Sequence, residues 1–147
     1  MDKEMLSENR RARFDYEIIE KYLTGIELLG PEVKSVKGGH VSLNGSYAIV
    51  RNGEVWLLNA TIPPYQQNNT LADYDPARTR RLLLHKNEIK ELLGKLEQKS
   101  ITLVPLKLLS SHGLIKVELG LARARKAHDK REVLKKRTAE REMRSTK

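Results

Sequence analysis

Positive charge is concentrated at the C-terminal end of this 147-residue chain. Residues 123–147 contain 11 Lys and Arg against 4 Asp and Glu, so they carry +7 of the formal net charge of +9. Their only large apolar residues are Val133, Leu134 and Met143, too few to bury the apolar surface that folding alone requires. A nearly neutral body with a basic tail predicts a nucleic-acid-binding protein whose tail is disordered until it meets a polyanion.

The body, residues 1–122, is long enough for one domain with a sizeable core, and we expect residues 1–8 within it to be flexible. No apolar run approaches the roughly 18 residues that span a bilayer, and the first nine residues lack the hydrophobic stretch of a secretory signal. The absence of cysteine excludes disulfides and thiolate metal sites and agrees with a reducing compartment. These features predict a cytoplasmic protein with no membrane partner.

Alternating apolar and polar residues predict that the body is built mainly from strands. The five main predicted strands span residues 14–28, 46–50, 54–58, 101–104 and 114–119, and residues 82–84 form a further short apolar strand. Asn52-Gly53 separates the second strand from the third, and this dipeptide is a strong signal for a tight hairpin turn. A second hairpin, turning through residues 110–113, is predicted to join the last two strands.

Two helices are predicted between these strands. In residues 30–37, Pro31 occupies the first turn, where its missing N–H costs nothing. Apolar residues recur at helical spacing between Ile89 and Leu96, which predicts an amphipathic helix. An antiparallel barrel with a helix between its third and fourth strands is the oligonucleotide-binding, or OB, arrangement, so we predict a mainly β, OB-like fold. A sheet packed on one helix in another α+β topology is the alternative.

The chain shows no arrangement that is typical of an enzyme. Its four histidines lie far apart in sequence, and no pair of them has the helical spacing of metal ligands. The sequence also lacks a glycine-rich phosphate-binding loop. We therefore expect no catalytic residue, no bound metal and no cofactor.

Arginine-rich clusters on the body add to the signal from the tail. One cluster, residues 9–13, precedes the first predicted strand, and another, residues 78–81, precedes the short apolar strand. Arginine pairs bidentately with phosphate and stacks on exposed bases, although any single cluster can also be a solvated surface. Because they adjoin an apolar strand, Arg80 and Arg81 should be presented to RNA from a rigid element.

Aromatic residues make up only 5% of the chain. A protein that reads single-stranded RNA by base stacking needs exposed aromatic rings, so the composition favours binding to folded RNA. We expect Tyr47, Tyr65 and Trp56 to be core or hairpin residues rather than stacking platforms.

Seven stretches of the chain form a specific pattern when they are taken in order. They are residues 9–16, 32–35, 46–47, 52–54, 75–85, 103–106 and 128–131. Together they resemble the small protein B family, the protein partner of transfer-messenger RNA (tmRNA) in bacterial trans-translation. The resemblance covers nearly the whole chain, from about Asn9 to Glu142.

The resemblance implies a non-enzymatic protein with an OB-like barrel. The family binds the tRNA-like domain of tmRNA at its elbow, and the body takes the place of the missing anticodon stem. The tail follows the empty messenger channel of a stalled ribosome, becomes helical there and reaches the decoding centre of the small subunit. The stalled peptide is then tagged for degradation and the ribosome is released. We expect this chain to act as a monomer with these two partners.

The arginine clusters and the resemblance together define the predicted site residues. The predicted RNA-binding residues of the body are Asn9, Arg10, Arg11, Arg13, Lys34, Arg78, Arg80, Arg81, Leu83 and Lys116. The predicted ribosome-binding residues of the tail are Arg123, Arg125, Lys126, His128, Asp129, Lys130 and Arg131. Among these, the resemblance itself implies RNA-side positions for Asn9, Leu83 and Lys116, and a decoding-centre motif for residues 128–131.

The chain departs from the family pattern at a few positions. Leu23 stands where an acidic residue is common, Pro31 stands where Thr or Trp is usual, and Ala124 replaces a glycine ahead of the tail motif. Leu23 is expected to extend an apolar patch with Leu83. Two other functions remain open from the residues alone: a general OB-type factor for structured RNA, and a phosphodiester-cleaving enzyme, which the lack of a metal-ligand cluster disfavours.

Overall fold

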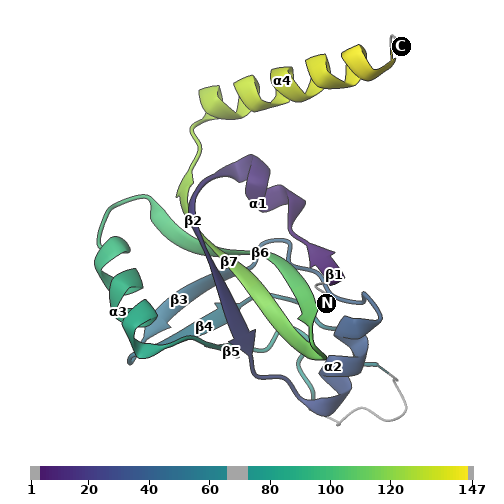
Figure 1. Cartoon of the computed structure of the whole chain (residues 1–147), viewed down its shortest axis with the longest axis vertical. Helices are drawn as coiled ribbons and strands as arrows, with labels where there is room; N and C mark the ends of the chain where they lie inside the picture. The colour runs from purple at the N-terminus through teal and green to yellow at the C-terminus, as the bar shows by residue number, and fades with distance from the viewer. Residues whose placement is uncertain (1–3, 66–72, 146–147) are drawn as a thin grey trace.

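The computed structural model describes residues 4–65 and 73–145 (Figure 1). The strands are β1 (Glu4–Glu8), β2 (Tyr16–Ile26), β3 (Tyr47–Arg51), β4 (Glu54–Leu58), β5 (Arg80–Leu83), β6 (Ile101–Ser111) and β7 (Leu114–Ala124). The helices are α1 (Arg10–Asp15), α2 (Gly30–Lys37), α3 (Lys86–Lys95) and α4 (Ala127–Ser145). No helix in these described ranges is long and apolar enough to cross a membrane.

Antiparallel pairing joins six of the strands into a closed ring. The order is β6-β3-β4-β5-β2-β7, and β7 pairs back onto β6, while β1 pairs with the later part of β6, beyond Leu103, where β3 pairs. The prediction of a mainly β, OB-like fold is confirmed, although the sheet closes into a ring rather than a regular barrel. The predicted amphipathic helix is α3, which lies between β5 and β6.

Both predicted hairpins are present. Asn52 and Gly53 have positive φ angles of 53° and 74°, as a two-residue turn between β3 and β4 requires. His112 and Gly113, with φ angles of 51° and 80°, turn β6 into β7 in the same way. The second hairpin is longer than predicted because its strands pair almost from end to end, from Ser111 opposite Leu114 to Ile101 opposite Arg123.

The N-terminal part of the chain differs from the prediction. Residues 4–8, expected to be flexible, form strand β1, in which Glu4 lies opposite Ser110 of β6. Residues 10–15 form helix α1, although strand was predicted from Phe14 onward. Asn9 caps this helix, because its side-chain oxygen accepts a hydrogen bond from the Ala12 N–H at 3.1 Å.

Two hydrophobic clusters hold the body together. The larger cluster joins the strands to α2 and α3, which contribute the fully buried Val36 and Leu92. The smaller cluster packs Ala12 of α1 against Leu106 of β6 and Ala122 of β7. Helix α1 is therefore fixed to the ring by apolar packing, and its polar residues are left on the surface.

The tail begins later than residue 123, because β7 continues to Ala124 and only two residues join it to α4. Helix α4 projects away from the body (Figure 1). Its contacts with the body include an ion pair of 3.2 Å between Lys130 Nζ and Asp15 Oδ1. The Arg137 guanidinium also lies 5.9 Å from the centre of the Phe14 ring. Disorder of the tail in solution, before it meets RNA, stays a prediction.

Candidate RNA-binding surface

The predicted arginine cluster at residues 9–13 is held by the buried Asn9. Only 3% of Asn9 is exposed, and its amide nitrogen donates to the carbonyl oxygens of Leu43 and Pro105 at 3.2 and 2.9 Å. The predicted role of the Asn9 side chain as an RNA ligand is therefore wrong, because its donors and its oxygen are all used inside the protein. Asn9 instead positions the helix that carries the neighbouring arginines.

Those arginines differ in how freely they can reach RNA. Arg10 is the most accessible, with 91% of its side chain exposed, and its contact with Glu8 is long, at 3.9 Å. Arg11 is exposed but partly engaged, since its guanidinium lies 5.3 Å from the centre of the Phe14 ring and 3.0 Å from Asp15. Arg13 is half-buried. Exposed pairs of this kind are worth at most about 1 kcal/mol, so a phosphate can replace them.

The second arginine cluster is split between the interior and the surface. The side chain of Arg80 is completely buried and donates to Glu32 Oε2 at 2.9 and 2.6 Å and to the Ala60 carbonyl at 2.9 Å. The prediction that Arg80 contacts RNA is therefore wrong, because this guanidinium is enclosed by protein acceptors. Arg81 remains accessible, with 42% of its side chain exposed in ion pairs to Glu27 and Glu54.

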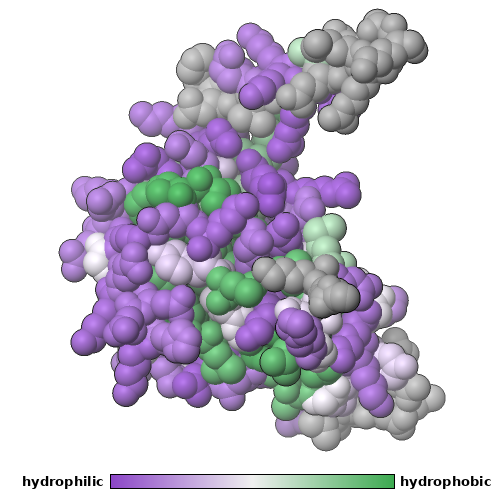
Figure 2. Space-filling model, in the orientation of Figure 1, coloured by the Kyte–Doolittle hydropathy of each residue, from purple (hydrophilic) through white to green (hydrophobic). Residues whose placement is uncertain are grey.

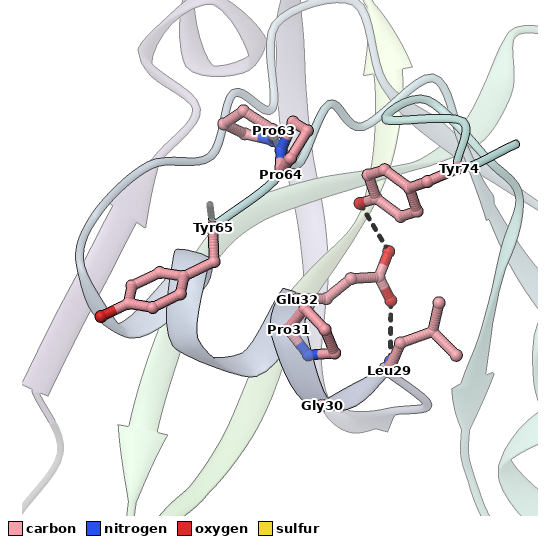
Figure 3. Close-up of a pocket in the computed structure, with 8 residues that line it drawn as sticks. All are labelled: Leu29, Gly30, Pro31, Glu32, Pro63, Pro64, Tyr65 and Tyr74. Carbon is pink, nitrogen blue, oxygen red and sulfur yellow. Dashed lines mark hydrogen bonds between the residues drawn. The ribbon is translucent and has the colours of Figure 1, made fainter. Parts of the chain in front are cut away.

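Glu32 of α2 is the centre of a buried polar network that the sequence analysis missed. Its carboxylate accepts hydrogen bonds from Arg80, from Arg78 at 2.5 Å and from the Leu29 N–H at 2.8 Å. The Tyr74 hydroxyl lies 3.0 Å from the same carboxylate (Figure 3). Arg78 is thus mainly a structural partner, although 30% of its side chain is exposed. The only local feature that pointed to this network was Glu32 behind Pro31 in the first turn of α2. An acidic residue at that position commonly accepts a hydrogen bond from the backbone N–H that precedes the helix.

The ionisation of Glu32 links this network to pH. Burial raises the pKa of Glu32, but hydrogen bonds from Arg78, the Leu29 N–H and Arg80 outweigh burial and lower the pKa from 4.5 to about 2. A carboxyl whose pKa is depressed on folding stabilises the protein above its unfolded pKa and loses that contribution as pH falls through its folded pKa.

We therefore expect the free energy of unfolding to fall by up to about 3 kcal/mol between pH 4.5 and pH 2 through Glu32 alone. Urea unfolding at a series of pH values, compared with a Glu32→Gln variant, measures this contribution. The variant should be less stable at pH 7 and should show a flatter pH dependence in that window. Parallel curves for the two proteins would contradict the assignment.

Leu83 and Lys116 come together although they are far apart in sequence. Both lie opposite Gly25 of β2, Leu83 from β5 and Lys116 from β7. A Cβ atom on Gly25 would lie 3.2 Å from the Leu83 Cβ, so glycine allows Leu83 its close approach. With Leu23, these residues border an open pocket of about 290 Å³.

The floor and rim of this pocket combine apolar surface with charge. Leu23 and Leu83 are 45% and 44% exposed, which agrees with the apolar patch predicted for them. His85 and Glu88, at the start of α3, also border the pocket and were not predicted. The face of the body drawn in Figure 2 is largely hydrophilic, with separate apolar areas between the polar side chains. A pair of exposed leucines beside a lysine is suited to pack on a base or ribose and to pair with a phosphate.

The remaining predicted residues lie outside this pocket. Lys34 is exposed on α2, where its Nζ atom lies 5.7 Å from the centre of the Tyr65 ring. In the tail, Arg123, Lys126 and Arg131 are exposed, whereas Arg125 and Lys130 are half-buried. The side chains of His128 and Asp129 lie outside the described residues. Within the described part of the chain, no group of three or more His, Asp or Glu could hold a metal ion.

Comparisons with known proteins identify the family of this chain. The family model described as SmpB protein matches residues 6–147. An SsrA-binding protein of Synechococcus elongatus is 55% identical over 139 residues, which cover 95% of this chain and 90% of the relative. An SsrA-binding protein of Thermosynechococcus vestitus is 56% identical over 139 residues, which cover 95% of this chain and 91% of the relative.

The fold is also matched by a solved structure of tmRNA-SmpB in the bacterial ribosome. That chain is 54% identical, with a TM-score of 0.69, and the match covers 82% of this chain and 85% of that chain. Since the family model spans almost the whole sequence and these relatives share more than half of their aligned residues with it, the chain belongs to the SmpB family.

Proposed function

We propose that this protein binds the tRNA-like domain of tmRNA and delivers it to stalled ribosomes for trans-translation, as a monomer in the cytoplasm. The observation that carries the proposal is the Leu83–Lys116 pocket, flanked by Leu23, on a body whose accessible basic residues can hold an RNA backbone. Membership of the SmpB family and the match to a tmRNA-SmpB structure support the choice of RNA.

The body holds the elbow of the tRNA-like domain. Leu23 and Leu83 supply an apolar surface for a base or ribose, and Lys116 pairs with an adjacent phosphate. Arg10 and Arg81 extend the contact, because both are accessible and held only by exposed ion pairs. None of these contacts requires a chemical step, so the protein acts as a binding factor rather than an enzyme.

The tail enters the empty messenger channel and reaches the decoding centre of the small subunit. Helix α4 carries most of the basic residues of the tail along a single element of 19 residues. Lys130 can exchange its ion pair with Asp15 for phosphates of ribosomal RNA, and the exposed Arg131 can bind them as well, because a basic helix neutralises phosphates. The helix thereby occupies the place where a codon–anticodon pair would otherwise be sensed.

A truncated protein that ends at Ala124 should still bind isolated tmRNA, because the Leu83–Lys116 pocket and the accessible arginines lie in the body. If six phosphates are contacted, the logarithm of the affinity should fall with the logarithm of the salt concentration at a slope of roughly −4 to −5. A filter-binding titration at several salt concentrations measures both quantities. A Leu83→Ala variant of the same truncated protein should bind more weakly at every salt concentration.

Two results would count against the proposal. If the truncated protein does not bind tmRNA, the body does not hold the RNA by itself. If a tRNA or an unrelated RNA hairpin competes as well as tmRNA for the full-length protein, the protein is a general factor for structured RNA instead.

A further inference from the structure

A second, apolar pocket lies beside the N-terminal end of α2 and has no part in the function proposed so far. Its walls are formed mainly by proline and tyrosine rings and by one leucine (Figure 3). The residues that supply these walls are Leu29, Pro31, Pro63, Pro64, Tyr65 and Tyr74. Its volume is about 190 Å³, and Leu29 and Tyr65 remain 40% and 49% exposed, so its mouth is open to solvent.

The pocket is held open by the buried network around Glu32. The Glu32 carboxylate binds the Leu29 N–H on one side and lies against the Tyr74 hydroxyl on the other, and so fixes two of the walls (Figure 3). The Tyr74 hydroxyl is in turn 2.7 Å from the Ile62 carbonyl oxygen, next to Pro63. Walls that are rigid before binding reduce the entropy lost when a ligand enters.

We propose that this pocket binds one unstacked nucleobase of RNA, with Lys34 on the adjoining phosphate. A volume of about 190 Å³ is smaller than the roughly 300–1,000 Å³ of sites for drug-sized ligands, so the pocket suits a single flat ring system. Tyrosine and proline rings offer flat faces, and any base can stack on an aromatic ring whatever its sequence. The Lys34 Nζ atom, 5.7 Å from the centre of the Tyr65 ring, stands at the rim.

The charges around the pocket favour a polyanion. Two guanidiniums, of Arg78 and Arg80, share the single negative charge of Glu32, which leaves a net charge of +1 below the walls. Lys37 lies one turn beyond Lys34 on α2 and is also exposed. The Asp75 carboxylate, which accepts a hydrogen bond from the Ala77 N–H at 2.9 Å, offsets part of this charge but not the two lysines on α2. An RNA strand therefore meets a positive rim around an apolar floor.

This inference rests on the proposed function in one respect only, that the ligand is RNA. It adds a contact that is separate from the Leu83–Lys116 pocket, and it assigns a stacking role to Tyr65, which the sequence analysis placed in the core or in a hairpin. Because this contact reads a splayed base, it applies to a single-stranded loop or to a bulge rather than to a paired stem.

The test uses the full-length protein and a 12-nucleotide oligouridine that carries one central 2-aminopurine, whose fluorescence is quenched when it stacks. We expect the wild-type protein to quench the probe and a Tyr65→Leu variant to bind it on the order of 5- to 10-fold more weakly with little quenching. The matched control is Tyr47→Leu, which removes another exposed tyrosine, on β3, and should leave both signals unchanged. A Lys34→Gln variant should lower the magnitude of the salt slope by about 0.7, the value for one phosphate of a single strand.

The outcomes separate this site from the proposed function. Equal binding and quenching by the Tyr65→Leu and Tyr47→Leu variants, with unchanged melting temperatures, would overturn the nucleobase site while leaving tmRNA binding through Leu83 and Lys116 intact. Displacement of the probe by a proline-rich peptide, lost in the Tyr65→Leu variant, would also overturn it and would identify a peptide site. If quenching depends on Tyr65 but tmRNA has no advantage over tRNA, the proposed function fails and the nucleobase site stands.

Discussion

Replacing Arg80 with Ala should lower the free energy of unfolding by about 3–5 kcal/mol, because the change removes the fully buried partner of the Glu32 carboxylate and leaves Arg78 as its remaining guanidinium. The corresponding fall in melting temperature is roughly 10 °C for a domain of this size. Thermal unfolding followed by circular dichroism measures it. RNA binding should fall only as far as the folded fraction falls, since Arg80 does not reach the surface.

The neighbouring Arg81 provides a matched control. It carries the same charge on the same strand, but its ion pairs with Glu27 and Glu54 are exposed to solvent. An Arg81→Ala variant should therefore lose at most about 1 kcal/mol of stability while it weakens RNA binding. Equal melting temperatures for the two variants would show that the pairing of Arg80 with Glu32 contributes little to the folded state.

Replacing His128, Lys130 and Arg131 together with Ala should abolish peptide tagging on stalled ribosomes while affinity for free tmRNA stays nearly unchanged. The reason is that the three residues lie in the tail, whereas the Leu83–Lys116 pocket that we propose for tmRNA lies in the body. A reconstituted translation reaction on a message without a stop codon measures tagging, and a filter-binding assay measures affinity.

A variant with Lys135 and Lys136 replaced by Ala serves as the matched control. Like the triple variant, it removes two positive charges from α4, but outside the predicted decoding-centre motif. It should retain most of the tagging activity. If the two variants lose tagging to the same extent, the tail acts as an electrostatic tether without a specific decoding-centre motif. Normal tagging by the triple variant would show that the motif is not needed at all.

The parts of the fold that sequence analysis predicted are those that depend on neighbouring residues. Asn52-Gly53 was enough to place the first hairpin, since a two-residue turn with positive φ angles is decided within the turn itself. Helix α2 was found from Pro31 in its first turn, and its bounds agree with the prediction. The apolar patch of Leu23 and Leu83 is the exception, because it was expected from the resemblance to the SmpB family and not from any local pattern.

The features that were missed depend on partners far away in the chain. Arg80 is buried because Glu32, 48 residues upstream, neutralises it, and an arginine cluster in a sequence gives no sign of such a partner. Asn9 is buried, and its side chain donates a hydrogen bond to the carbonyl oxygen of Pro105, which lies 96 residues away in the sequence. Strand β1 likewise forms only against β6, with Glu4 opposite Ser110. Local patterns therefore located basic clusters, but only the fold separates the arginines that face solvent from those that hold the core.

If the body and α4 bind separate sites as proposed, the two-residue joint between β7 and α4 makes the protein a bivalent ligand. Once one part has bound, the other can search only the small volume that the joint allows, where its effective concentration is on the order of millimolar. Avidity can then exceed the affinity of either part about 10²- to 10⁴-fold, provided that both binding sites lie within reach at once. A partner that offers only one of the two sites is held by the weaker single contact and is soon released.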